Sequence, residues 1–408
     1  MSRCCLWLVA AVLTLLMWTS VNAFALASPP DIRIAIYQGQ RLQIQGSSQF
    51  VLRDENDRLI GSAFANNKCT VCLKDGRWEV TTFDGVVVAN NITHSRIKVV
   101  VSKGAALTIG NQTACRYRGH FVLVKTESDR FVMINTIGVE NYLQGVVGAE
   151  MPSTWPLAAL KSQAIASRTY SLHELYQKQH HDLWDVYSDQ RSQVYRPLGN
   201  VSRVAKCVLS RAISETKGVV LTCGEKHKEK LFPAFYSAAC GGFTQSAHEV
   251  FGRSWPALNA KRCLYCQNSN SDAWFWTTQL IDKREVSRLL FLKHKQLLPL
   301  GEITQVAVAR QSKYGRVESL LLTGRNGRCA RIRAIDFRLA VSTANAPIKS
   351  SWYTLIDAGN AWQFENGLGY GHGVGLCQHG VGEMARLGHH TEAILDYYYP
   401  DATLVKAY

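Results

Sequence analysis

Glu150 is the acidic residue whose surroundings best suit catalysis. It ends a nearly uncharged segment that begins at Gln144, and it precedes Met151-Pro152. Such neighbours exclude water from a carboxyl group, which raises its pKa and makes it a general acid near neutral pH. Cleavage of a glycosidic bond needs such an acid. The alternative is a glutamate near a helix start that only stabilises the helix dipole.

Glu140 is the competing carboxylate, but it lies beside Asn141 in a more polar segment. We expect it to cap a helix or to pair with Arg168, which falls within the apolar stripe of the helix expected next. A guanidinium on a buried helix face needs a carboxylate or carbonyl partner. No residue stands out as a second catalytic carboxylate for Glu150, so a mechanism with one acid fits better than hydrolysis by two.

A glycine-rich motif near the C-terminus, Gly371 to Gly380, contains His372, Cys377 and Gln378. Glycines allow the backbone to approach a ligand closely and leave its amides free to bind. The alternative is a tight structural turn in which His372 bonds only to backbone.

Ten cysteines remain once Cys4 and Cys5 are assigned to a leader. Cys263 and Cys266 have the spacing of two zinc ligands, and Cys240, His248, Cys377 or His379 can complete a tetrahedral set. We take Cys240, Cys263 and Cys266 as the candidate metal residues, with zinc as an optional rather than a required cofactor. Disulfides are the alternative, because exported proteins meet an oxidising compartment. Cys69 and Cys72 form a second such pair.

Residues 1–27 read as a signal peptide, with an apolar run after Arg3 and cleavage expected after Ala27; an uncleaved anchor is the alternative. Either a cleaved signal peptide or an uncleaved anchor places the protein in the periplasm or cell envelope. The net charge of +15 favours a polyanionic partner, either wall polymer or a membrane surface with anionic lipids. Nucleic acid is not expected as a partner, since the basic residues form no tract interleaved with aromatics.

Strand and helix patterns are segregated along the chain, which favours an α+β fold. Short alternating segments predict a β-rich N-terminal domain over residues 28–112, followed by a mixed domain over 113–408 whose helix carries the active-site region. A helix capped by Ser153 or Thr154, with Pro156 in its first turn, is expected to run to about Gln177 with one apolar stripe. Further predictions are strands at 215–222 and 231–236 and helices near 381–387 and 391–398.

Several ordered sequence blocks between about 113 and 408 resemble one known family, the SpoIID family of stage II sporulation protein D and amidase enhancers. The blocks are Arg116-Tyr117-Arg118-Gly119, Asn135 to Tyr142, Gly145 to Pro152, Ala159 to Ala164, Arg168-Thr169-Tyr170, Gln193-Val194-Tyr195, Glu215 to Gly218, Tyr236-Ser237, Gly241 to Thr244, Phe337-Arg338, and Gly371 to Gly375 with Gln378.

The resemblance implies a lytic transglycosylase that cleaves between N-acetylmuramic acid and N-acetylglucosamine in peptidoglycan strands stripped of stem peptides. Glu150 matches the catalytic glutamate of the family. The matched blocks also imply a set of substrate-binding residues: Arg168, Tyr170, Gln193, Tyr195, Ser237, His372 and Gln378.

The sequence departs from the family pattern at two places. Some members bind zinc near the segment that corresponds to 187–195, where Tyr187, Ser188 and Ser192 offer no suitable ligands here. Cys377 stands where serine is usual, and His379 where an aromatic residue is usual. The competing function is a non-catalytic wall-binding protein that activates a partner amidase, and a zinc hydrolase of stem peptides is a third.

Overall fold

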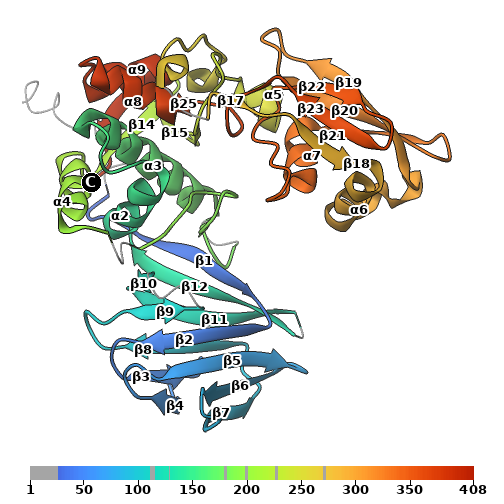
Figure 1. Cartoon of the computed structure of the whole chain (residues 1–408). Helices are drawn as coiled ribbons and strands as arrows, with labels where there is room; N and C mark the ends of the chain where they lie inside the picture. The colour runs from blue at the N-terminus through green and yellow to red at the C-terminus, as the bar shows by residue number, and fades with distance from the viewer. Residues whose placement is uncertain are drawn as a thin grey trace, which may run out of the picture.

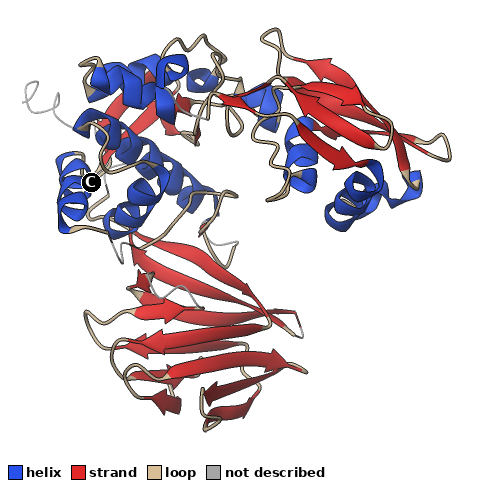
Figure 2. Ribbon diagram, viewed as in Figure 1, coloured by secondary structure: helices blue, strands red, loops and turns tan. Residues whose placement is uncertain are grey.

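The computed structural model describes residues 26–408 except 111–114, 128, 179–181, 198–200, 226–227 and 270–272. The expected signal peptide therefore lies almost wholly outside the described residues. Within the described ranges, no helix is both long and apolar enough to cross a membrane. The predicted α+β class is confirmed, with a β-rich region first and helices after it (Figure 2).

Two mainly antiparallel sheets form the N-terminal part of the molecule (Figure 1). In β5, alternate residues are buried, as expected for strands with one face on a core. The rings of Trp78 and Phe131 meet between the sheets at 5.1 Å. One sheet has the order β13 (Val186–Tyr187), β1 (Asp31–Gly39), β12 (Arg130–Gly138), β11 (His120–Glu127), β8 (Arg96–Val101), β3 (Phe50–Arg53), β4 (Leu59–Ala63). The other has the order β10 (Arg116–Tyr117), β9 (Leu107–Ile109), β2 (Arg41–Gly46), β5 (Lys68–Lys74), β6 (Arg77–Thr82), β7 (Val87–Ile92).

Strands from both sides of residue 112 share these sheets. β8 pairs with β11, with Val99 opposite Phe121, and β9 pairs with β10. The chain then passes from β12 directly into α2 (Val139–Glu150) at Gly138. The first sheet therefore fixes where the helix that ends at Glu150 begins.

The long helix α3 (Leu157–Lys178) is present as predicted, but it begins at Leu157, so Pro156 precedes its first turn rather than lying in it. The expectation of a single apolar stripe is wrong, because nearly every residue from Ala159 to His173 is buried, polar ones included. The cause is its central position, because several elements pack around it: α2, α4 (Arg203–Glu215), β14 (Val219–Cys223), α8 (Gln378–Arg386) and α9 (Thr391–Tyr398). Its polar side chains must therefore find partners inside the protein.

Residues 203–215 form α4 (Arg203–Glu215), which the sequence patterns did not predict. Ser202 caps this helix by accepting a hydrogen bond from the amide of Ala205. The predicted strand over 215–222 is corrected to β14 (Val219–Cys223), which follows a turn at Gly218 with φ of +72°. The predicted C-terminal helices are present as α8 (Gln378–Arg386) and α9 (Thr391–Tyr398). The remaining elements around α3 are β15 (Lys230–Leu231), β16 (Tyr236–Ser237), α5 (Ala247–Phe251), η1 (Pro256–Leu258), η2 (Cys266–Ser269), β25 (Leu376–Cys377) and β26 (Ala402–Lys406).

Residues between about 275 and 368 form a separate unit, drawn in orange in Figure 1. It has its own hydrophobic core, which runs from Trp276 to Phe364, whereas the main core stops at Cys266 and resumes at Val374. The chain thus leaves the helical part after Cys266 and returns before Val374. The unit contains β17 (Phe275–Trp276), β18 (Gln279–Asp282), α6 (Lys283–Lys293), η3 (Lys295–Leu300), β19 (Ile303–Gln311), β20 (Val317–Gly324), β21 (Cys329–Arg333), α7 (Ala334–Val341), β22 (Thr354–Asp357), β23 (Ala361–Glu365) and β24 (Gly367–Leu368).

Candidate functional site

Glu150 is the last residue of α2, and its side chain is partly buried. The reading in which it stabilises a helix start is wrong, because the carbonyl end of a helix carries partial negative charge. A carboxylate at that end is disfavoured rather than favoured. Folding alone therefore does not explain an acid at this position.

Two hydrogen bonds hold the Glu150 carboxyl group. The amide of Val194 donates to Oε1 at 2.8 Å, and Nε2 of Gln378 donates to Oε2 at 3.3 Å. The Tyr236 side chain lies close to the same group, yet its Oη has no hydrogen-bond partner among the described residues. Burial raises the pKa of Glu150, while Val194, Gln378 and Tyr236 act against that rise. The carboxyl is thus held in place and kept easier to protonate than a surface glutamate.

A buried chain of amides and hydroxyls extends from Gln378 into α3. Gln378 Nε2 also donates to Oε1 of Gln163 at 3.3 Å, and Gln163 Nε2 donates to Oγ of Ser167 at 2.9 Å. Gln193 Nε2 donates to the carbonyl of Ser167 at 3.3 Å, and the hydroxyl of Tyr142 donates to Oε1 of Gln193 at 3.0 Å. Because each member has a partner, the network fixes the orientation of Gln378 beside Glu150.

The sequence singled out Gln193 and Gln378 in this network and overlooked Gln163, Ser167 and Tyr236. Gln163 and Ser167 lie on α3 at i and i+4, so they share one helix face. Polar residues at that spacing inside an apolar pattern were the available signal. For Tyr236 the available signal was its place next to Ser237 in a matched block.

Tyr195 and Tyr170 are buried near this network without bonding to Glu150. Tyr195 Oη donates to Oδ1 of Asn135 at 3.3 Å, and its ring lies 5.0 Å from that of Tyr142. Burial raises the pKa of both phenols. Tyr195 also lines a cavity of about 790 Å³ whose wall includes two guanidinium groups, those of Arg116 and Arg118. Glu150 does not line this cavity, which offers positive charge beside Tyr195.

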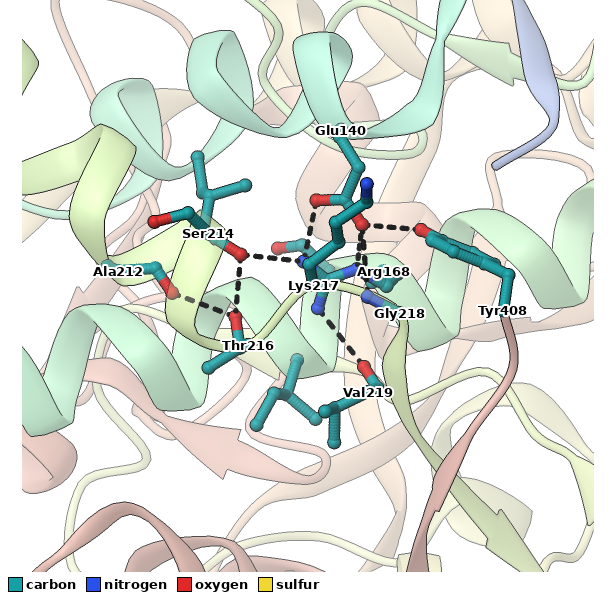
Figure 3. Close-up of polar contacts among 12 residues, drawn as sticks. Glu140, Arg168, Ala212, Ser214, Thr216, Lys217, Gly218, Val219 and Tyr408 are labelled. Atoms are coloured by element: carbon teal, nitrogen blue, oxygen red, sulfur yellow. Dashed lines mark hydrogen bonds and ion pairs between the residues drawn. The ribbon is translucent and has the colours of Figure 1, made fainter. Parts of the chain in front are cut away.

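Arg168 lies apart from Glu150 and pairs with Glu140, as predicted (Figure 3). Nε of Arg168 donates to Oε1 of Glu140, and Nη2 of Arg168 donates to Oε2, both at 2.9 Å. Burial alone would raise the pKa of Glu140, but Arg168 and the hydroxyl of Tyr408 hold it below its usual value. The carbonyl of Val219 accepts a further bond from Arg168 at 3.1 Å. This pair joins α2, α3 and the start of β14.

Ser237 and His372 belong to the contact between β16 and the glycine-rich loop. The amide of Gly373 donates to Oγ of Ser237 at 3.2 Å, and the amide of Val374 donates to Nδ1 of His372 at 2.9 Å. Burial, together with the positive charges of Arg338 and Arg316, lowers the pKa of His372 to about 3. The imidazole is therefore neutral near pH 7 and acts as an acceptor for the loop backbone.

Four buried cysteines come together from three segments: Cys240, Cys263, Cys266 and Cys377. Their Sγ atoms all lie within 4.8 Å of one another. The three candidate metal residues are thus adjacent, and Cys377 rather than His379 or His248 joins them. The His379 ring instead lies 5.3 Å from that of Trp155.

The alternative of disulfides is not seen: no disulfide joins any of the ten cysteines in the described part of the chain. For Cys69 and Cys72 the reason is local. Both lie on β5, where residues three apart point to opposite faces of the sheet, so Cys69 is buried and Cys72 is not. Neither a disulfide nor a shared metal suits that pair.

Comparison with known proteins finds one family model and several proteins that this chain resembles. Residues 127–223 match the family model SpoIID, described as stage II sporulation protein. An uncharacterised protein of Brachyspira hyodysenteriae is 28% identical over 278 residues, which cover 68% of this chain and 69% of that protein. The amidase enhancer of Bacillus subtilis is 27% identical over 64% of this chain, and the match spans only 40% of the enhancer's length. Stage II sporulation protein D of the same organism is 24% identical, over 67% of this chain and 76% of its own.

Proposed function

We propose that this chain, whose residues 127–223 match the SpoIID family model, acts on glycan strands of the bacterial cell wall as a lytic transglycosylase, with Glu150 as the acid and base. The observation that carries the proposal is the setting of Glu150. It is a partly buried carboxyl with a raised pKa, held by Val194 and Gln378 at a helix end that disfavours its charge. An acid kept at such a position is expected where it is used in chemistry.

The reaction needs one acid and no second carboxylate. Glu150 gives its proton to the glycosidic oxygen as the bond from that oxygen to C1 of N-acetylmuramic acid breaks. The carboxylate then takes the proton of the muramoyl 6-hydroxyl as that oxygen bonds to C1. No water is consumed, and the product ends in a 1,6-anhydro sugar. In the described residues, the groups that contact the Glu150 carboxyl are an amide, a backbone N–H and a phenol.

Two features of positive charge support an anionic substrate. The cavity beside Tyr195 presents Arg116 and Arg118, which suit the lactyl carboxylates of stripped glycan. The net charge of +15 would hold the protein on the wall polymer, in the periplasm or cell envelope.

Incubation of the full chain with peptide-free glycan, followed by mass analysis, tests the proposal. We expect the wild type to release anhydro-ended fragments, one water lighter than hydrolysis products, and Glu150→Gln to release at least a hundred-fold less. Glu392→Gln changes an exposed carboxylate on α9 and serves as the matched control. Fragments with reducing ends, or equal release by Glu150→Gln, would refute the mechanism.

The second candidate is a non-catalytic activator of a wall amidase, and the similarity to the amidase enhancer favours it. In that case wild type and Glu150→Gln would both release no anhydro sugars. Both would instead increase the release of stem peptides by an added N-acetylmuramoyl-L-alanine amidase. The same protein preparations separate the two functions.

A further inference from the structure

We propose that Cys240, Cys263, Cys266 and Cys377 bind one zinc ion as four thiolates, and that this ion fastens the inserted unit to the helical part that carries Glu150. All four side chains are buried, and their sulfur atoms lie within 4.8 Å of one another. Tetrahedral zinc with Zn–S bonds of about 2.3 Å separates its sulfur ligands by about 3.8 Å. The Sγ atoms of Cys240 and Cys266 lie 3.4 Å apart, close to that separation.

The surroundings of the sulfur atoms suit thiolates. The amide of Cys240 donates to Sγ of Cys377 at 3.2 Å, and Oη of Tyr398 lies 3.2 Å from Sγ of Cys263. Donors of this kind stabilise and orient metal-bound sulfur. Gly380 of α8 packs so closely that an added Cβ would lie 3.1 Å from Sγ of Cys263. Four soft ligands in a closed, buried group are typical of a structural zinc site.

Arg316 provides an independent argument from charge. Its side chain is buried, and it donates to the carbonyl of Cys240 at 2.7 Å and to that of Gly371 at 3.2 Å. Among the described residues it has no carboxylate partner. A buried cation without a counter-charge is costly. Zinc with four thiolates carries a net charge of about −2, which supplies that counter-charge beside Cys240.

The positions of the four cysteines in the chain indicate which parts of the protein a bound ion would hold together. Cys266 is the last core residue before the inserted unit, and Cys377 follows soon after the chain returns. Arg316 comes from the unit itself, just before β20, and reaches back to the cluster. One ion can therefore tie the entry and the exit of the unit to Cys240. It also fixes the residue before Gln378, which bonds to Glu150.

Metal analysis of the full chain, purified without chelators, tests this proposal independently of the enzymatic one. We expect about one zinc per chain and no disulfide among the four cysteines by mass analysis of alkylated peptides. Cys266→Ser and Cys377→Ser should each lower the zinc content at least five-fold. Cys207→Ser and Cys329→Ser replace exposed cysteines and should keep it. Glu150→Gln should also keep it, so loss of activity and loss of metal are separable.

Titration of the wild type with a mercurial reagent covers the case in which the cysteine variants fail to fold. Zinc should appear in solution as the four buried thiols react, and hydrogen exchange should increase in residues 372–380 while the sheet of β2 and β5 stays protected. Zinc-free protein whose cluster cysteines are joined in disulfides would overturn the proposal. Bound iron, or zinc retained in Cys266→Ser and Cys377→Ser, would overturn it equally.

Discussion

Gln378 donates a hydrogen bond from Nε2 to Oε2 of Glu150 at 3.3 Å, although the two residues are 228 positions apart in the chain. The contact exists because β16 and β25 pair in parallel, with Tyr236 opposite Leu376 and Ser237 opposite Cys377. That pairing delivers both Tyr236 and Gln378 to the end of α2. The start of α8 is therefore part of the site.

Gln378→Ala should lower the turnover of stripped glycan roughly ten-fold, because a hydrogen bond to a charged group is lost. The bond from Gln378 acts to lower the pKa of Glu150. Without it that pKa rises, so the alkaline limb of the pH–rate profile should move to higher pH. Gln305→Ala removes an exposed glutamine in β19 and should change neither quantity. An unshifted alkaline limb in Gln378→Ala would contradict the inferred coupling.

Arg168→Ala should destabilise the protein by about 3–5 kcal/mol, because it leaves Glu140 without its charged partner in a mostly buried position. Arg211→Ala breaks an exposed pair with Glu215 on α4 and should cost less than about 1 kcal/mol. Urea unfolding measures both. Equal midpoints for the two variants would mean that the pair does not join α2, α3 and β14 as described.

The lowered pKa of buried His372 predicts that the protein loses stability in acid. Its pKa in the folded protein is about 3, below the unfolded value of 6.5, so the stability it contributes is present above pH 6.5 and declines as the pH falls toward 3. The slope is at most about 1.4 kcal/mol per pH unit. His372→Asn keeps an acceptor for the amide of Val374 but has no proton to gain. The melting temperature of His372→Asn should therefore fall less than that of the wild type between pH 6.5 and 4. Equal falls in melting temperature for the two proteins would contradict the burial of a neutral imidazole.

Gly373→Ala should unfold more easily than Gly388→Ala. Both glycines have positive φ, +77° and +89°, so both substitutions strain the backbone. At Gly373 the new Cβ would also lie 2.8 Å from Cζ of Arg316, which is buried and cannot move aside, whereas Gly388 faces open space. We expect an additional cost of about 1–3 kcal/mol at Gly373. Equal thermal stability of the two variants would argue against close packing of the loop on Arg316.

Local patterns in the sequence determined several features of this protein. The presence of α3, the helices at the C-terminus and the α+β class depend on capping, proline and periodicity, which act over a few residues. The pairing of Arg168 with Glu140 was predictable because a charge on a buried helix face needs a partner. The desolvation of Glu150 followed from its small and apolar neighbours, and the raised pKa agrees with it.

Only the tertiary structure decided which distant side chains meet. Cys69-x-x-Cys72 and Cys263-x-x-Cys266 look alike as sequence, but the side chains of the first pair lie on opposite faces of β5, whereas the second pair is completed by Cys240 and Cys377. No local pattern marks Arg316 as the residue that lies against Cys240 and Gly373. The burial of α3 on nearly all sides likewise depends on elements that pack around it. These features are set by long-range strand pairing and core packing, whereas residue types and spacing report only the preferences of a segment for its immediate surroundings.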